Sequence, residues 1–182
     1  MTISTVSKGE AVLASSYNQL VANVNGSPGR SIFTSSGTFT VPAGCHKFKV
    51  WICGAGGHGG AATGTPPYAG DGGDSPLVSA LFSGVDVGTT FAITVGSVSS
   101  SGGGSSSFGT SLVVSGGSGG TSNADTDGAD GSVTTNTGSS IMYHAHVLLD
   151  SSGSAYGVGG AGATAQGGSG SAGTQGVVMI EW

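Results

Sequence analysis

Two histidines near the end of the chain have the spacing of a metal site. His144 and His146 alternate in "YHAHV", which places both imidazoles on one face of an expected strand. Two imidazoles are too few for a closed site. Three chains around one axis would supply six nitrogens, which suit octahedral iron or a similar ion. The alternative is a pair of partly exposed histidines that bind no metal.

A second candidate metal site lies in "NADTDGADG". Asn123, Asp125 and Asp127 have the spacing of the first half of a calcium loop, D-x-[DN]-x-[DN]-G. The bidentate glutamate that closes such a loop is missing, because Thr134 stands at the twelfth position. The alternative is a solvated turn rich in Asp and Asn. We expect that the protein requires no cofactor, with iron or a similar ion at His144 and His146 and calcium at Asn123, Asp125 and Asp127 as the two possible metals.

The stretch Gly54–Gly59 matches the dinucleotide fingerprint G-x-G-x-x-G and follows an expected strand. That motif works only where its third glycine opens a helix that holds a pyrophosphate. Here the chain continues Gly-Ala-Ala-Thr-Gly-Thr-Pro-Pro, which has no amphipathic period and ends in two prolines. The sequence therefore argues against a nucleotide site.

No assembled catalytic site is recognisable in the sequence. The chain lacks a G-x-S-x-G nucleophile motif, and Asp71 with Asp74 in one loop does not make the paired carboxylates of a glycosidase. We therefore expect a protein that is not an enzyme.

The composition limits the classes of partner. The chain has 38 glycines in 182 residues, far above the usual share of about 7%. Its net charge of −5 and four basic residues leave no basic patch for nucleic acid. It has no run of 18 apolar residues, so membrane insertion is not expected. "MTISTVSKGE" lacks the apolar core of a signal peptide, which predicts folding in a cytoplasm.

The two cysteines are expected to be free thiols. Cys45 and Cys53 bracket one expected strand, and eight extended residues separate them by about 26 Å. A disulfide needs Cα atoms within about 7 Å of each other.

From Ser31 onward the hydrophobic pattern has a period of two, which predicts strands. In "HKFKVWIC", Phe48, Val50 and Ile52 alternate with Lys47, Lys49 and Trp51. The sequence predicts an all-β fold of seven or eight short strands, a β-sandwich or jelly-roll-like domain. The expected strand regions are "IFTSSGTFTVPAG", "HKFKVWIC", "SPLVSALFSG", "TTFAITVGS", "SSSFGTSLVVSGG", "SIMYHAHVLLD" and "GVVMIEW".

Glycine islands separate these strands and are too long for tight turns. They are Gly54–Gly64, Ala69–Asp74, Ser101–Gly104, Ser115–Gly120 and Gly157–Gly173. They could be mobile loops, at a large ordering cost on folding. Alternatively, they form extended threefold helices of the polyproline II type, whose backbone groups must bond neighbouring segments.

The first residues have a different character. Ser7 and Glu10 form a capping box, so a helix is predicted over Lys8–Asn25 and ends at Gly26. Its apolar residues are spaced like a short coiled-coil seam. The seam could drive self-association, or the helix could pack on its own domain. The seam residues are Leu13, Tyr17, Leu20 and Val24.

Several of these segments, in this order, resemble the glycine-rich domain of bacteriophage tail-fibre and tail-tip proteins. "GTFTVPAGCHKFKVWICGAGGHGG" resembles the opening of that domain, and "GGGSSSFGTSLVVSGGSGG" resembles its central segment. "GTQGVVMIEW" resembles its last strand, and "VLASSYNQLV" the short helix that often precedes it. The resemblance covers most of residues 31–182, but not Ser139–Asp150.

The resemblance implies a virion protein that is made in the host cytoplasm and usually trimeric, with exposed glycine-rich loops that bind a receptor on the host surface. It divides the chain into an attachment helix, residues 1–30, which would bind another virion protein, and the domain, residues 31–182. The candidate receptor contacts are Tyr68, Asp71 and Tyr156 in glycine islands. The two tyrosine rings could instead cover the domain's own core. The alternatives are a structural virion component, such as a head decoration or fibre-cap protein, and a bacterial surface adhesin.

Overall fold

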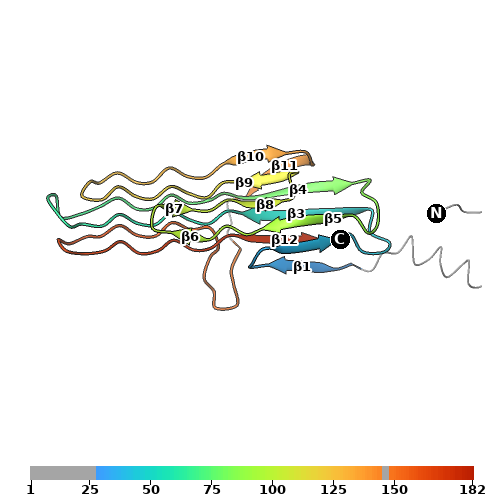
Figure 1. Ribbon diagram of the computed structural model, residues 1–182, viewed down its shortest axis with the longest axis horizontal. Coiled ribbons are helices and arrows are strands. Elements are labelled where there is room, and N and C mark those ends of the chain that lie inside the picture. Colours follow the sequence, from blue (N-terminus) through green and yellow to red (C-terminus); the bar gives the residue numbers. More distant parts are fainter. Residues whose placement is uncertain (1–27, 145–147) are drawn as a thin grey trace, which may run out of the picture.

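The structure of the protein, a computed structural model, describes residues 28–144 and 148–182. Every regular element within them is a β-strand, so the all-β prediction is confirmed for this part of the chain. The strands gather at one end, and glycine-rich segments run away from them side by side (Figure 1). The helix predicted for Lys8–Asn25, with its seam residues, lies outside the described residues.

Two five-stranded antiparallel sheets make up the strand end of the molecule. Sheet A has the order β1-β12-β3-β4-β11 and sheet B the order β10-β9-β8-β5-β2. The strands of sheet A are β1 (Arg30–Phe33), β12 (Val177–Glu181), β3 (Lys47–Cys53), β4 (Leu77–Ser83) and β11 (Ser139–His144). Those of sheet B are β10 (Val133–Asn136), β9 (Leu112–Val114), β8 (Ser106–Phe108), β5 (Thr90–Thr94) and β2 (Gly37–Thr40). A small hairpin pairs β6 (Val98–Ser99) with β7 (Gly102–Gly103).

One hydrophobic core joins the facing sides of the two sheets. The inward residues of β3 are Phe48, Val50 and Ile52, as the alternation predicted, and all three are buried. From sheet B, the fully buried Phe108 stacks on Phe91 with ring centroids 4.2 Å apart. It also contacts Phe48 edge-on at 5.7 Å, so the two sheets are held by aromatic side chains.

The prediction of strands was incomplete in sheet B. "SSSFGTSLVVSGG" contains two strands, β8 and β9, because Gly109 adopts a positive φ of 55° and turns the chain between them. Strand β10 was not predicted, because Val133 is the only apolar residue among its four. Its pairing with β9 decides its conformation.

Both cysteines are free, as predicted, and the structure shows that both are buried. Cys53 closes β3 and belongs to a small second cluster with Leu77 and Val177 on the outer side of sheet A. Burial raises the pKa of the Cys53 thiol to about 11, and it raises the pKa of Cys45 as well.

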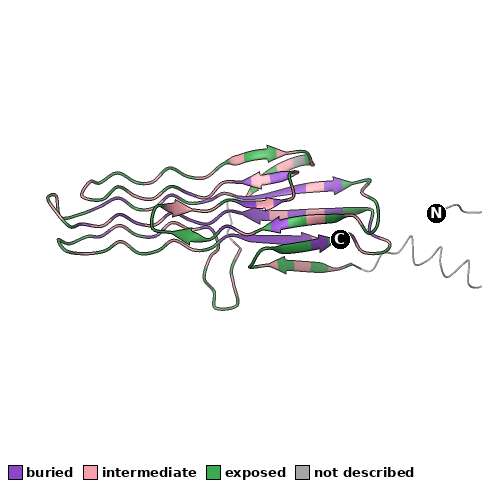
Figure 2. Ribbon diagram, in the orientation of Figure 1, coloured by how far each residue is buried: buried purple, intermediate pink, exposed green. Residues whose placement is uncertain are grey.

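The strands continue into six extended segments which, together with the β6–β7 hairpin, we call the glycine bundle. The extended segments are residues 54–62, 69–76, 115–121, 126–132, 157–164 and 168–176, and the hairpin spans residues 96–104. Figure 1 shows the extended segments leaving the strand ends as roughly parallel, wavy lines. The buried stretches of the strands continue into the middle of the bundle, while its outer segments are more exposed (Figure 2). The glycine islands are therefore ordered against one another.

Segment 54–62 lies at the centre of the bundle, and its hydrogen bonds repeat every three residues. One set of N–H groups donates to segment 168–176, and a second set donates to segment 69–76. The first set runs from Gly56 to Thr174 (2.8 Å), from Gly59 to Ser171 (2.9 Å) and from Ala62 to Gly168 (3.0 Å). The second runs from Gly57 to Gly73 (2.8 Å) and from Gly60 to Gly70 (2.9 Å).

The carbonyls of the central segment follow the same period. They accept from segment 115–121 and the residues after it, and from segment 157–164. The donors are Gly117 to Ala55 (3.0 Å), Gly120 to His58 (2.8 Å), Asn123 to Ala61 (3.0 Å), Gly160 to Gly57 (2.8 Å) and Ala163 to Gly60 (3.1 Å). A period of three is that of an extended threefold helix, which has no internal hydrogen bonds and must make them laterally.

Glycine is required wherever a segment faces another backbone. A Cβ on Gly56 would overlap the carbonyl of Val158, and one on Gly57 would overlap that of Ser118. The central segment, with neighbours on several sides, therefore has two glycines per three-residue turn. The outer segment 126–132 has one, at Gly128 and Gly131, because only one of its faces is packed so closely.

Serines mark the junction where the two sheets converge into the bundle. Sheets packed through side chains lie about 10 Å apart, whereas bundle segments hydrogen bond directly. At the junction, the Oγ of buried Ser75 accepts from the Gly54 N–H (2.7 Å) and donates to the Ser115 carbonyl (2.9 Å). Buried Ser106 likewise accepts from the Gly96 N–H at 2.9 Å. The serine hydroxyls therefore pair buried backbone groups that have no backbone partner among the described residues at this point.

Candidate functional site

Three turns close the far end of the glycine bundle, and we call them the distal turns: residues 63–68, 122–125 and 165–167. They lie at the opposite end of the molecule from Trp182 (Figure 1). Each connects an outgoing segment of the bundle to the returning one. Because the segments behind them are hydrogen bonded to one another, the turns are held in fixed relative positions.

Asn123 links two of these turns. Its Oδ1 accepts from the Gly64 N–H at 2.6 Å, and its Nδ2 donates to the Thr63 hydroxyl at 3.3 Å. Its φ of 54° lies in the left-handed region, which asparagine tolerates better than most residues. The side chain predicted as a calcium ligand is therefore used to fix the distal turns.

Tyr68 lies at the end of the first distal turn, with 45% of its surface exposed. It follows Pro66 and Pro67, which restrict the backbone before it. The ring does not belong to either hydrophobic cluster of the described residues. Tyr68 is thus an exposed aromatic side chain on a rigid support, as the receptor prediction requires.

Asp71 lies on the side of the bundle, where it connects three segments. Its Oδ1 accepts from the Gly162 N–H at 2.7 Å, and its own N–H donates to Asp127 Oδ1 at 2.8 Å. Three residues on, Asp74 repeats the pattern with Gly159 (2.7 Å) and Asp130 (2.9 Å). These carboxylates accept from N–H groups that would otherwise face solvent at the rim of the bundle.

The spacing of polar residues in the sequence indicates these rim contacts. Asp71 and Asp74 are three residues apart, as are Asp127 and Asp130. The same spacing separates Ser171 and Thr174, whose hydroxyls accept from Ala161 (2.7 Å) and Val158 (2.8 Å). Polar residues at i and i+3 in a glycine-rich tract thus mark the exposed face of a threefold helix.

The residues of the candidate calcium loop point to separate partners. Asn123 binds the Thr63–Gly64 turn, while Asp127 accepts from Asp71 on the side of the bundle. Asp125, between them, is exposed. Within residues 28–144 and 148–182, no group of three His, Cys, Asp or Glu side chains is placed to hold a metal ion.

His144 ends β11 on the outer side of sheet A. Its Nε2 lies 2.8 Å from the Ser79 hydroxyl, and its ring centroid lies 4.5 Å from that of Trp51. Lys49 covers the same indole at 3.8 Å. His146, its partner in the candidate metal site, is outside the described residues, so the His-x-His site stays a prediction.

Tyr156 lies at the junction between sheets and bundle, far from Tyr68. It follows a small hairpin in which Leu149 bridges Ala155, and its N–H donates to the Leu148 carbonyl at 2.9 Å. Asp150 caps this hairpin by accepting from the Ser152 hydroxyl, and bonds of this kind lower its pKa. The half-buried Tyr156 ring packs against the cluster around Cys53.

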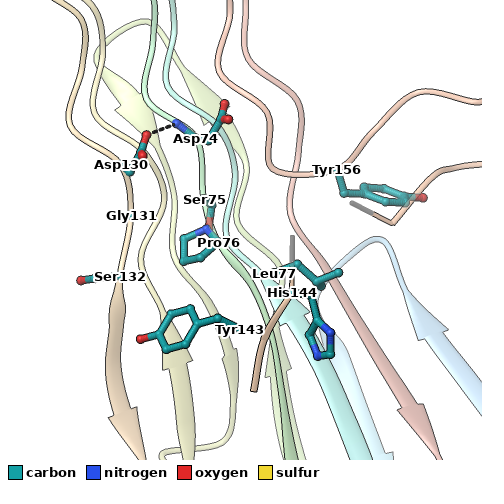
Figure 3. A pocket seen from close by; sticks show the side chains of 10 residues that line it. All are labelled: Asp74, Ser75, Pro76, Leu77, Asp130, Gly131, Ser132, Tyr143, His144 and Tyr156. Carbon is teal, nitrogen blue, oxygen red and sulfur yellow. Dashed lines mark hydrogen bonds between the residues drawn. The ribbon is translucent and has the colours of Figure 1, made fainter. Parts of the chain in front are cut away.

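A cavity of about 320 Å³ opens beside Tyr156 at this junction. One wall leads from the bundle into β4 and another into β10, and the end of β11 closes it below. Figure 3 shows the carboxylates of Asp74 and Asp130 at one end and the Tyr143 ring at the other. The lining residues are Asp74, Ser75, Pro76, Leu77, Asp130, Gly131, Ser132, Tyr143, His144 and Tyr156.

The structure therefore separates the predicted site residues into three places. Tyr68 and Asn123 lie at the distal end, Asp71 and Asp127 on the side of the bundle, and Tyr156 with His144 around the junction cavity. Tyr143 and Asp130 at the cavity were not predicted. Tyr143 lay in the stretch that the family resemblance did not cover.

Comparison of the chain with protein-family models and with curated proteins finds no match. Among the described residues there is no helix long and apolar enough to span a membrane.

Proposed function

We propose that this protein is a bacteriophage virion protein, a tail-fibre or fibre-tip adhesin that binds a host surface receptor through the distal turns. The proposal starts from the sequence resemblance to tail-fibre glycine-rich domains. It includes the finer description of the fold, a β-sandwich with packed polyglycine II segments behind an N-terminal helix. Its place in the virion follows from the same resemblance.

The observation that carries the proposal is that the point of attachment of residues 1–27 and the distal turns lie at opposite ends of the molecule. Gly29 and Trp182 pair through two backbone hydrogen bonds of 2.8 and 3.0 Å at the sheet end, where residues 1–27 join the described domain. The distal turns lie at the opposite end (Figure 1). A chain attached through its first residues would hold these turns outward. An exposed aromatic side chain on a rigid support loses little conformational entropy on binding.

Attachment and oligomerisation are assigned to residues 1–30 in this proposal. Leu13, Tyr17, Leu20 and Val24 would form the contacts of a homotrimer, and the same helix would bind a neighbouring virion protein. Light scattering on the full chain measures the mass directly. Leu20→Asp should convert trimer to monomer, whereas a trimer unchanged by Leu20→Asp would exclude the seam as the interface.

The receptor role is tested by binding of fluorescent full-length protein to the bacteria that its phage infects, and by competition with phage adsorption. We expect binding and competition, and a loss of at least about tenfold in Tyr68→Ala, since aromatic anchors often contribute more than 1.4 kcal/mol. Val87→Ala, at a turn of the sheet end and 46% exposed, is the matched control that should bind normally.

The structural alternative makes the opposite prediction. If virions contain the protein, but purified protein neither binds cells nor competes, and virions lacking it adsorb normally, the chain is a structural component. That result would overturn the receptor-binding proposal.

A further inference from the structure

We propose that the junction cavity binds one neutral hexose unit of a glycan, stacked on Tyr143 and hydrogen bonded through its hydroxyls to Asp74 and Asp130. This is a second ligand site, separate from the distal turns. It does not depend on the distal turns contacting a receptor.

The position of Tyr143 is the first argument for a ligand. Tyr143 lies on the same side of β11 as Ile141, which packs on the core, but one step nearer the junction. There the sheets no longer cover it, and 64% of the tyrosine is exposed. An aromatic ring held by a paired strand, yet outside the core, is available for contact. The C–H face of a pyranose is apolar and slightly positive, which suits the negative face of such a ring.

The two carboxylates at the other end of the cavity are the second argument. Asp74 Oδ1 accepts from Gly159, and Asp130 Oδ1 accepts from the Asp74 N–H. These bonds fix both carboxylates, while their Oδ2 atoms have no hydrogen bond within the described residues. Two fixed acceptors across the cavity from an aromatic ring can accept hydrogen bonds from the hydroxyls of a ligand that contacts the ring, and charged acceptors make the stronger bonds.

Size and charge narrow the ligand class. A cavity of about 320 Å³ is at the lower end of the range for small-molecule sites, so one ring fits better than an extended chain. None of the described lining residues is Lys or Arg, and two are aspartates. The cavity therefore disfavours phosphate, sulfate and sialic acid, and favours a ligand that donates hydrogen bonds.

The test uses the full-length protein labelled with ¹⁵N and a panel of methyl pyranosides of glucose, galactose, mannose and N-acetylglucosamine at millimolar concentrations. We expect at least one pyranoside to shift the amide signals of Leu77, Gly131 and Ser132, with saturation transfer to its ring protons. Inorganic phosphate should give no shift.

Three variants separate the roles of the lining residues. Tyr143→Ala should abolish the shifts, and its exposure means that the fold is retained. Tyr143→Phe should keep them, because the stacking face remains. Asp130→Asn keeps an oxygen for the Asp74 N–H but removes the charge, so we expect affinity to fall about tenfold.

Three results would overturn the proposal. The first is no amide shift with any pyranoside at about 50 mM, a concentration of the order at which weak single-ring ligands are detected. The second is a shift that persists in Tyr143→Ala. The third is binding of n-butylamine but of no sugar, which would make this a cation site. Tyr68→Ala should leave sugar binding unchanged, so failure here and failure of the receptor proposal are distinguishable.

Discussion

The sheet end and the glycine bundle are held together by different interactions, although the chain passes directly from the strands of one into the segments of the other. In the sheet end, the layers are separated by large side chains, and Phe108 alone contacts Phe39, Phe48, Phe82 and Phe91. In the glycine bundle the layers touch through their backbones. Gly57 donates to one neighbouring segment and accepts from another at 2.8 Å each.

The difference between the two parts shows that a protein interior can be built from backbone alone, without large side chains. Ala55, Gly57 and Gly60 are as fully buried as the residues of the hydrophobic core. What is buried there is peptide backbone, which is tolerated only because its N–H and C=O groups are paired. The two parts should therefore respond to mutation in opposite ways. Removing side-chain atoms should destabilise the sheet end, whereas adding side-chain atoms should destabilise the glycine bundle.

The largest effect is expected from removing a side chain in the sheet end. Phe108→Ala should lower the free energy of unfolding by about 4 kcal/mol, because a fully buried aromatic ring is lost and a cavity remains. Chemical denaturation measures this directly. A loss below about 1 kcal/mol would show that the ring cluster does not hold the sheets together.

Adding one carbon in the bundle should have an effect nearly as large. Gly57→Ala should cost about 3 kcal/mol, because its Cβ would overlap the carbonyl of Ser118, and backbone on both sides restricts relaxation. Thermal unfolding of Gly57→Ala and Gly64→Ala provides a matched pair. At Gly64 the nearest atoms to a Cβ are in the Asn123 side chain, 3.4 Å away, so less than about 1 kcal/mol is expected. Equal losses in the two variants would contradict the account.

Alkaline pH should weaken the junction moderately. Burial raises the pKa of Cys53 to about 11 from an ordinary value of 9.0. The folded thiol thus keeps its proton when the unfolded one ionises. The contribution of the protonated Cys53 thiol to the free energy of unfolding is complete below about pH 9. It falls as the pH rises toward 11, by at most about 2 to 3 kcal/mol. Denaturation at pH 8 and pH 10.5 should show this fall, and Cys53→Ala should reduce the pH dependence. An identical pH dependence in the unmodified protein and in Cys53→Ala would show that the Cys53 thiol is not the cause of the fall.

The smallest effect is expected at the rim. Asp71→Ala removes the acceptor for the Gly162 N–H, which solvent can partly replace, so about 1 kcal/mol or less should be lost. Asp71→Asn keeps an oxygen at that place and should lose less. The comparison is made by differential thermal unfolding. An equal loss in Asp71→Asn and Asp71→Ala would mean that the charge, which both variants remove, matters more at this position than the hydrogen bond.

The sequence predicted the sheet end better than the bundle, for physical reasons. Alternation in β3 indicates which side chains are buried, because a period of two places every second residue on one face of a strand. For the glycine islands the sequence left two alternatives, mobile loops or packed segments. Glycine has no side chain, so no hydrophobic pattern can indicate whether it is buried. The islands' period of three appears only within short segments, as in Ala55–Gly60.

The sites were predicted less well than the fold. Exposed Tyr68 could be recognised from the Pro-Pro pair before it. The rim contacts of Asp71 could not, because their partners, Gly162 and Asp127, are 91 and 56 residues away in sequence. The junction cavity is formed by four separate stretches of the chain, so no single motif predicts it.

The central claim is that the bundle is held by backbone hydrogen bonds between segments. Amide hydrogen exchange of the native protein, resolved by residue, tests it most directly. We predict that Gly57, Gly60, Gly70 and Gly73 exchange as slowly as the strand amides of β3, while Ala165 and Gln166 in a distal turn exchange fast, because their N–H groups have no backbone acceptor within the described residues. If the glycine amides of segment 54–62 exchange at the rate of an unstructured peptide while β3 stays protected, the claim is contradicted.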